Sequence, residues 1–249
     1  MLHAFSRTEM LIGTENLNKL KNSKIAVFGI GGVGTFVVEG LARSAVGSFV
    51  LVDDDDICLT NMNRQIHATR KTVGKSKVEV MKQRILEINP KAQVEVFHEL
   101  YNKDSADRML LPDYSYVVDA IDMISAKLDL VERCYKMGIP IMSSMGAGNK
   151  LNPTMLEVAD IYETSVCPLA RVIRTELRKR NIPKLKVVYS KEKPLTPLEL
   201  DGGCKTNCIC PNKDRTCADR RQIPGSVSFV PSVTGLIIAS EVVKDIIKK

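Results

Sequence analysis

The sequence predicts an α/β protein built on a Rossmann-like, doubly wound and mostly parallel sheet, with an irregular, cysteine-containing C-terminal crossover region. Three observations support this prediction. Short apolar runs alternate with segments of helical periodicity, a glycine-rich turn follows the first run, and acidic residues follow later runs. Such alternation is typical of βαβ units, in which crossover helices connect parallel strands of one sheet.

The first part of the chain has the clearest strand and helix signals. Apolar runs that end in glycine or aspartate are typical of buried parallel strands, whereas Val78, Met81 and Ile85 have the spacing of one helix face. Asn89-Pro90 ends that helix, because the residue before proline disfavours the helical conformation. We expect strands at residues 24–30, 48–53, 93–98, 116–122 and 140–144, and helices at about 32–43, 74–88 and 125–138.

The second part of the chain has a looser pattern. A long stretch, residues 191–228, lacks apolar periodicity, which is unusual inside a compact domain and typical of functional segments. The chain then closes with an amphipathic helix. We expect strands at about 155–161 and 186–190, a basic helix at about 169–179 and the final helix at 231–249.

Composition excludes a membrane-spanning protein. The 249 residues are 44% hydrophobic and 26% charged, which is ordinary for a globular chain, and no apolar run approaches the length of a bilayer span. The first ten residues also lack the apolar stretch of a secretory signal. We therefore expect a cytoplasmic location and no membrane partner.

Basic residues are in excess, and they concentrate in one segment. The formal net charge is +7, and nine of the Lys and Arg residues lie between Arg171 and Lys193. This segment is a candidate nucleic-acid face, although a solvated basic helix surface would have the same composition. The chain has no Trp and few aromatic residues, so no base-stacking platform is evident.

Four of the seven cysteines fall within one short polar segment. Cys204, Cys208, Cys210 and Cys217 have the spacing C-x3-C-x-C-x6-C, which differs from the paired C-x-x-C of common zinc modules. A bound zinc ion, an iron–sulfur cluster and reduced thiols without a ligand role are the three interpretations left open. A disulfide framework is not expected in a cytoplasmic chain.

The glycine-rich turn and the acidic residues predict a nucleotide site. Gly29, Gly31, Gly32 and Gly34 follow the first strand and open a helix, where backbone amides bind phosphate. Asp53, at the end of the next strand, has the position of a ribose-binding carboxylate. Asp55 and Asp56 could help to hold Mg²⁺, whereas a solvated turn is the alternative interpretation of the acidic run.

Two cations favour a triphosphate over a dinucleotide. A dinucleotide pyrophosphate is usually held by backbone amides, whereas departing pyrophosphate needs cations to stabilise its charge. Arg64 and Lys77 supply two cations in the segments after Asp53. A non-catalytic or NAD-binding protein would need neither Arg64 nor Lys77, so this class of function is the least favoured.

Five short motifs follow one another in the order that one family has. They are Gly29-x-Gly31-Gly32-Val33-Gly34, Asp53-x-Asp55, Asn61-x-x-Arg64-Gln65, Gly74-x-x-Lys77 and Asp119-x-x-Asp122. With these motifs, residues 7–147 resemble the ThiF/MoeB/HesA superfamily of ubiquitin-activating-type adenylating enzymes. The resemblance implies one adenylating domain over residues 1–249, with an ATP-binding half at about 7–147 and a substrate-binding crossover and C-terminal helix at about 148–249.

The resemblance also implies a role for each residue. Asp53 would bind the ribose of ATP, Asn61, Arg64 and Lys77 would contact phosphates, and Gln65 would belong to the same nucleotide site. Asp122 would position Mg²⁺ or the attacking carboxylate. The family further implies a homodimer, in which Arg7 reaches the neighbouring subunit's ATP as an arginine finger. The implied catalytic set is Arg7, Arg64, Lys77 and Asp122.

Motifs in the second half narrow the resemblance to one branch, the tRNA threonylcarbamoyladenosine dehydratases. These motifs are Gly146-Ala-Gly-Asn-Lys-Leu-Asn-Pro153, Val158-Ala-Asp-Ile161, Pro168-Leu-Ala-Arg-Val172 and Pro224-Gly-Ser226. The branch implies an ATP-dependent ligase-type enzyme that cyclises N6-threonylcarbamoyladenosine beside the tRNA anticodon with loss of water. The threonyl carboxylate would be activated as an acyl adenylate, with an acyl phosphate as the alternative intermediate.

That chemistry needs no protein nucleophile, because the cyclising nitrogen belongs to the same substrate. The sequence agrees with the absence of a protein nucleophile, because it lacks a clear Cys-His pair. It also lacks the two C-x-x-C pairs of many superfamily members. Cys167 stands where related dehydratases often have Asp, and we interpret it as structural. The alternative function is adenylation of a ubiquitin-like sulfur carrier. The expected partners are tRNA, a second copy of the chain and, in one interpretation, a sulfur-transfer protein.

Overall fold

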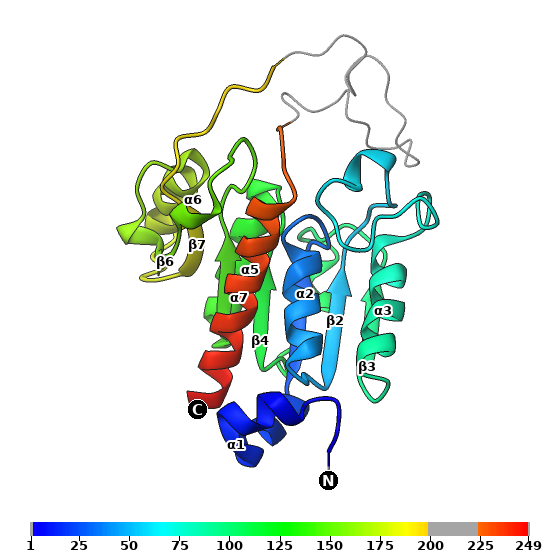
Figure 1. Cartoon of the computed structure of the whole chain (residues 1–249). Helices are drawn as coiled ribbons and strands as arrows, with labels where there is room; N and C mark the ends of the chain where they lie inside the picture. Colours follow the sequence, from blue (N-terminus) through cyan, green and yellow to red (C-terminus); the bar gives the residue numbers. More distant parts are fainter. Residues whose placement is uncertain (1, 199–223, 249) are drawn as a thin grey trace.

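A seven-stranded sheet forms the centre of the protein (Figure 1). The computed structural model describes residues 2–198 and 224–248, and in these ranges the strand order is β3-β2-β1-β4-β5-β7-β6. Neighbouring strands are parallel except β6 and β7, which are antiparallel. The α/β prediction is therefore confirmed. The strands are β1 (Lys24–Phe28), β2 (Ser48–Val52), β3 (Gln93–Phe97), β4 (Tyr116–Asp119), β5 (Ile141–Ser144), β6 (Leu156–Asp160) and β7 (Lys186–Ser190).

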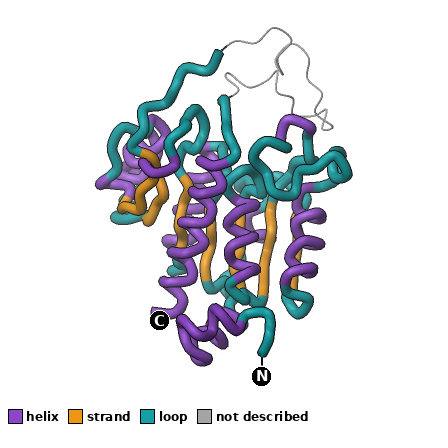
Figure 2. Tube along the Cα trace, viewed as in Figure 1, coloured by secondary structure: helices purple, strands orange, loops and turns teal. Residues whose placement is uncertain are grey.

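Helices cover both faces of the sheet (Figure 2). Helices α2, α3 and α7 pack on one face against residues such as Ile25 and Val27, whereas α4, α5 and α6 pack on the other against Ala26 and Val187. This alternation follows from the two-residue period of a strand. The helices are α1 (Ser6–Lys21), α2 (Gly34–Arg43), α3 (Lys77–Ile88), α4 (Ala106–Met109), α5 (Ile124–Met137), α6 (Pro168–Lys179) and α7 (Phe229–Lys248), with short 3-10 turns at Leu59–Asn61, Pro153–Met155 and Ile161–Glu163.

The strand order reverses between β1 and β4, which are neighbours in the sheet. The chain runs from β1 outward to β2 and β3, then returns to place β4 on the other side of β1. Connections that leave two adjacent parallel strands in opposite directions open a crevice beyond their carboxyl ends. The loops after β1, β2 and β4 meet at this crevice.

Helices α2 and α7 lie in close contact, because two glycines remove the side chains between them. A Cβ atom on Gly235 would overlap the carbonyl of Val33 and lie 2.8 Å from the Cβ of Phe36. A Cβ on Gly40 would lie 2.8 Å from the Cβ of Ala239. The C-terminal helix is thereby held beside the helix that begins at the glycine-rich turn.

Several features differ from the sequence-based expectations. The strand expected at 24–30 ends at Phe28, which leaves Gly29 and Ile30 in the turn, and the short helix α4 (Ala106–Met109) was not expected. Helix α1 was not expected, because it has no continuous apolar stripe: Met10 and Leu11 are 85% and 88% exposed, and Gly13, at φ 81°, interrupts the helix. The strand expected at 116–122 ends at Asp119, so that Asp122 lies in the following loop.

The four clustered cysteines, Cys204, Cys208, Cys210 and Cys217, lie outside the described residues. None of the helices in the described ranges has the length and apolarity needed to cross a membrane.

Replacing Gly235 with Ala tests the α2–α7 contact. Helix propensity alone predicts that Gly235→Ala stabilises the protein by about 1 kcal/mol. Because the added methyl group would overlap the backbone at Val33, we expect instead a net loss of about 2 kcal/mol in the free energy of unfolding, measured by guanidinium denaturation. Ser240→Ala, at an exposed position of the same helix, is the matched control and should change little. A stabilised Gly235→Ala protein would contradict the close contact.

Candidate active site

A cavity of about 480 Å³ lies at the carboxyl ends of β1, β2 and β4. Most of the nucleotide-site residues expected from the sequence line it. This volume falls in the usual range for cofactor sites. The expected residues that line the cavity are Gly29, Gly31, Gly32, Asp53, Asp55, Asn61, Arg64, Gln65, Lys77 and Asp122.

The glycine-rich turn is shaped by close backbone contacts. Gly29 has φ 90°, and a Cβ there would lie 2.6 Å from the carbonyl oxygen of Ala120, in the loop after β4. Gly34 does not line the cavity. A Cβ on this residue would overlap the Gly29 carbonyl, so Gly34 allows the turn to close onto the start of α2. The turn therefore presents backbone amides at a helix N-terminus, the usual geometry for binding phosphate.

Buried His67 supports the same turn through a hydrogen bond to its backbone. Its Nε2 lies 3.1 Å from the carbonyl oxygen of Ile30, and since a carbonyl only accepts, Nε2 carries the proton. Its Nδ1 has no hydrogen-bond partner among the described residues. Burial lowers the pKa of His67 to about 4, so the ring is neutral near pH 7.

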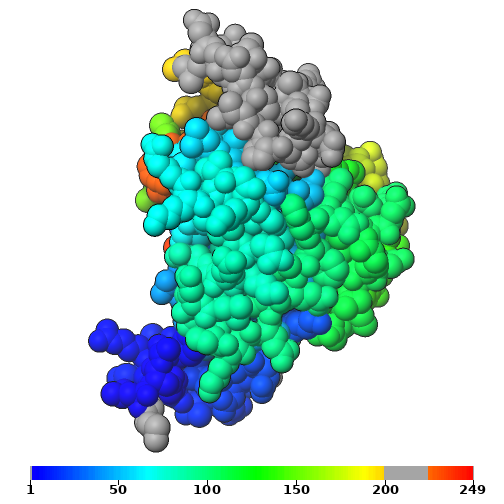
Figure 3. Space-filling model, turned by 90° about the vertical axis from the view of Figure 1, so that its right-hand side faces the viewer, coloured from blue at the N-terminus to red at the C-terminus, as the bar shows by residue number. Residues whose placement is uncertain are grey.

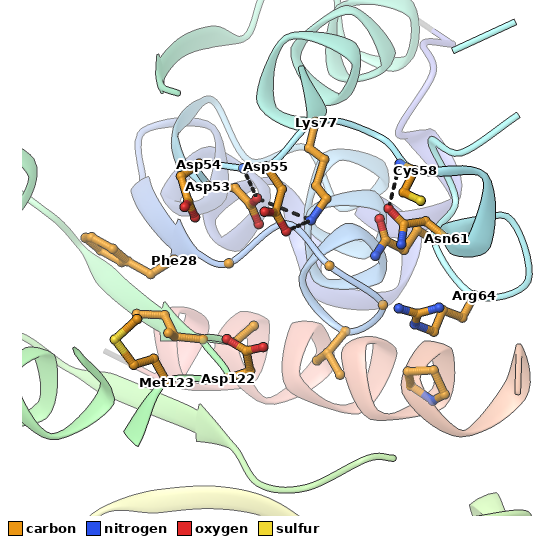
Figure 4. Close-up of a pocket in the computed structure, with 18 of the residues that line it drawn as sticks. Phe28, Asp53, Asp54, Asp55, Cys58, Asn61, Arg64, Lys77, Asp122 and Met123 are labelled. Atoms are coloured by element: carbon orange, nitrogen blue, oxygen red, sulfur yellow. Dashed lines mark hydrogen bonds and ion pairs between the residues drawn. The ribbon is translucent and has the colours of Figure 1, made fainter. Parts of the chain in front are cut away.

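Asp53, Asp55 and Lys77 form a charged group at the end of β2 (Figure 4). Asp53 accepts hydrogen bonds from the backbone amides of Ile30 (2.6 Å) and Asp55 (3.0 Å), which ties it to the glycine-rich turn. Lys77 Nζ lies 2.6 Å from Asp55 and 3.4 Å from Asp53. Burial opposes the charge on Lys77, but the two carboxylates outweigh it and raise the pKa of the ammonium group.

The segment after β2 holds the second cation. Asn61 is buried, and its Oδ1 accepts a hydrogen bond from the Cys58 amide at 3.0 Å, which shapes the 3-10 turn Leu59–Asn61. Arg64 Nη1 donates to the Thr60 carbonyl at 2.8 Å. Gln65 also lines the cavity, and its buried Oε1 has no hydrogen-bond partner among the described residues. Asn61 thus supports the loop that carries Arg64.

Asp122 lies on the opposite wall, in a loop that a buried ion pair supports. Lys127 and Asp119 have fully buried side chains, with Nζ 2.7 Å from Oδ2. Lys127 also donates to the Ser144 carbonyl at 3.0 Å, and Asp119 Oδ1 accepts from the Ile121 amide at 3.1 Å. The pair therefore joins the ends of β4 and β5 beneath Asp122. The role of Lys127 could not be predicted from the sequence, because its partner Asp119 is not on the same helix face.

An apolar end completes the cavity. Phe28, Val52 and Met123 line it beside Tyr101, whose ring packs edge-on against Phe28 with centroids 5.0 Å apart. Tyr101 donates to Asp129 at 2.9 Å. Sequence reasoning missed this end, because strand-end apolar residues look the same whether they line a core or a base pocket. The cavity thus has an apolar end and a polar, charged end, as a nucleotide requires.

Carboxylates also gather where a metal ion could bind. Oxygen atoms of Asp53, Asp54 and Asp55 all lie within 4.8 Å of one another. Such hard oxygen donors suit Mg²⁺, and Asp122 adds another carboxylate to the cavity. Asp56, the other residue considered for Mg²⁺, lies 3.4 Å from His98.

Arg7 is not brought to this cavity. It is exposed on α1, and the end of α1 contacts the amino-terminal edge of the sheet, where the Leu20 carbonyl accepts from the Gly47 amide just before β2. Figure 1 shows α1 at the end of the molecule opposite the site. Cys167 is 3% exposed and packs in the core beside α6, as a structural role requires.

The His67 environment predicts a specific pH dependence. The unfolded chain takes up a proton near pH 6.5, whereas the folded ring resists protonation until about pH 4, so stability is lost as pH falls through this window. The loss should reach about 3 kcal/mol. We expect His67→Gln to flatten the fall in unfolding free energy between pH 6.5 and 4, measured by denaturant titration. Parallel curves for the two proteins would contradict the assignment.

The sequence and the structure of this chain are similar to those of known proteins. The chain is 45% identical over 249 residues to the tRNA threonylcarbamoyladenosine dehydratase of Bacillus subtilis, covering 100% of this chain and 96% of that one. It is 35% identical to the Escherichia coli enzyme of the same name, covering 98% and 94%. The crystal structure of E. coli TcdA in complex with ATP aligns with a TM-score of 0.84 at 34% identity, again covering 98% and 94%.

A more distant relative shares only part of the chain. The sulfur carrier protein ThiS adenylyltransferase of E. coli is 31% identical over 59% of this chain and 60% of its own. The profile of the ThiF family, in contrast, matches residues 5–249. The chain therefore belongs to the ThiF family.

Proposed function

We propose that this protein is an ATP-dependent tRNA threonylcarbamoyladenosine dehydratase, which activates the threonyl carboxylate as an acyl adenylate and closes it into a ring. The observation that carries the proposal is the similarity of this chain, over its full length, to dehydratases of that name. The cavity of this chain also has cations that suit a triphosphate. An ATP complex of a structural relative supports the choice of nucleotide.

The proposed reaction has two steps. A carboxylate oxygen of the substrate attacks the α-phosphorus of ATP and pyrophosphate leaves, which makes an acyl adenylate. A nitrogen of the same substrate then attacks the activated carbonyl carbon and loses its proton, and AMP leaves with the original carboxylate oxygen. Proximity within one substrate accelerates ring closure, so the protein needs only to position and to stabilise charge.

The described residues suit these tasks. The amides of the glycine-rich turn and the cations Arg64 and Lys77 would stabilise the phosphates and the departing pyrophosphate. Asp53, already held by two backbone amides, would accept from the ribose hydroxyls. Asp122, with the carboxylates near Asp53, would hold Mg²⁺, which when bound neutralises phosphate charge.

The position of Arg7 fits a site shared between two copies of the chain. Helix α1, which carries Arg7, lies at the end of the molecule opposite the cavity (Figure 1), so Arg7 could act only on a neighbour's nucleotide. Leu2 (93%), which precedes α1, and Met10 (85%) and Leu11 (88%) in α1 are exposed, and Figure 3 shows the N-terminal residues projecting from the base of the molecule. Exposed apolar side chains of this kind mark interaction surfaces.

The remaining expectations rest on the proposed substrate. A tRNA would meet a chain with net charge +7, and tRNA modification would place the enzyme in the cytoplasm. Zinc at the clustered cysteines stays a prediction. Activation of a sulfur carrier, or association with a sulfur-transfer protein, is less well supported, because the sulfur-carrier relative matches only 59% of the chain.

The function can be tested on the modified nucleoside itself. Purified protein is incubated with tRNA that carries threonylcarbamoyladenosine and Mg-ATP, and the digested nucleosides are analysed by mass spectrometry. We expect the nucleoside to lose the mass of one water in an ATP-dependent manner. An unchanged nucleoside, in a preparation that exchanges pyrophosphate into ATP with a small carrier protein, would support the alternative.

Mixed dimers test the role of Arg7. Arg7→Ala and Lys77→Ala proteins should each be folded by circular dichroism and inactive as dimers of one kind. Refolding them together would give about half mixed dimers, each with one intact site, so about a quarter of wild-type activity should return. No recovery in verified mixed dimers would contradict an arginine finger that acts between subunits.

A further inference from the structure

A short segment before α7 crosses the rim of the cavity and is held on both sides. Pro224 and Ser226 line the cavity, and Gly225 lies between them. On one side, the Gly225 amide donates to Asn149 Oδ1 at 2.7 Å, and the Asn149 amide donates to the Gly225 carbonyl at 2.8 Å. On the other side, Asn63 Nδ2 donates to the Ser226 carbonyl at 2.9 Å. We call residues 224–226 the strut.

The Asn149 side of the strut is well fixed. Asn149 has φ 59°, a left-handed conformation that asparagine tolerates better than most residues. Its carbonyl accepts from the Leu195 amide at 2.8 Å, so this one residue of the loop after β5 is hydrogen-bonded both to Leu195 and to the strut. A Cβ on neighbouring Gly148 would lie 3.0 Å from the Cβ of Pro224, which shows how closely this loop packs on the strut.

On the Asn63 side, the strut is connected through hydrogen bonds to Arg64, a candidate for binding phosphate. Asn63 Oδ1 accepts a hydrogen bond from Arg64 Nη1 at 3.0 Å, while Nδ2 of the same amide donates to Ser226. Arg64 Nη1 also donates to the Thr60 carbonyl at 2.8 Å. Both hydrogens of Nη1 are thus engaged, and a planar guanidinium held at one nitrogen by two acceptors has a defined orientation.

We propose that Asn63 is a positioning residue that couples the strut to Arg64 and so sets the orientation of the guanidinium for the triphosphate. The inference rests on the proposed use of ATP at this site, but not on the identity of the acceptor substrate. Asn63 does not itself need to touch the nucleotide, because its amide works through two neighbours. Its oxygen orients Arg64, and its nitrogen connects that arginine to the strut.

The test is a double-mutant cycle on ATP affinity. Mg-ATP binding is measured by calorimetry, without tRNA, for the wild type, Asn63→Ala, Arg64→Ala and the double variant. We expect Asn63→Ala to weaken binding about threefold to tenfold and Arg64→Ala to weaken it more. The double variant should bind like Arg64→Ala alone, because Asn63 acts through that arginine. Multiplicative weakening, or wild-type affinity in Asn63→Ala, would overturn the inference.

A control separates positioning from general loss of structure. Asn152 is exposed and does not line the cavity, and its Oδ1 accepts hydrogen bonds from the Thr154 amide at 3.0 Å and the Thr154 hydroxyl at 2.6 Å, within its own turn. Asn152→Ala should therefore lose two side-chain hydrogen bonds, as Asn63→Ala does, and keep wild-type ATP affinity. If Asn152→Ala weakened binding as much as Asn63→Ala, a structural effect would replace the inference. A wild type that fails to bind Mg-ATP would overturn the proposed function as well, so the two failures are distinguishable.

Discussion

The close approach of two backbones at the point where the strand order reverses is the constraint on which the site depends. The turn after β1 and the loop after β4 can touch only because Gly29 has no side chain where Ala120 passes. This contact sets the amides proposed to bind phosphate on one side of the crevice and Asp122 on the other. The buried Asp119–Lys127 pair holds the second loop in place, so removing either charge would leave the other without compensation inside the core.

Charge in the cavity is already organised before a nucleotide enters. Lys77 is neutralised by Asp53 and Asp55, and Asp53 is itself oriented by two backbone amides. A triphosphate would compete with these carboxylates for the ammonium group, and Mg²⁺ would compete with the ammonium group for the carboxylates. Groups that are held in place beforehand need little reorganisation during reaction, which is the main source of electrostatic catalysis.

Much of this arrangement could be predicted, because its signals are local. The glycine-rich turn, Asp53 at a strand end and Lys77 at the start of α3 each follow from short motifs and strand periodicity. Helix α1 could not be predicted in this way, since it buries only Leu17 and Leu20. The strut and its contacts with Asn63 and Asn149 join residues more than seventy positions apart, and no periodicity in a sequence reports such pairing.

The most direct measurement traces the carboxylate oxygen that is transferred to phosphorus when the substrate is activated. Substrate tRNA is prepared with oxygen-18 in both positions of the threonyl carboxylate, and the phosphorus-containing products are analysed by mass spectrometry after turnover with Mg-ATP. If the carboxylate attacks the α-phosphorus, each AMP formed carries one labelled oxygen, and we expect this result. Label in inorganic phosphate with ADP as the other product would contradict an acyl adenylate and assign activation to the γ-phosphate.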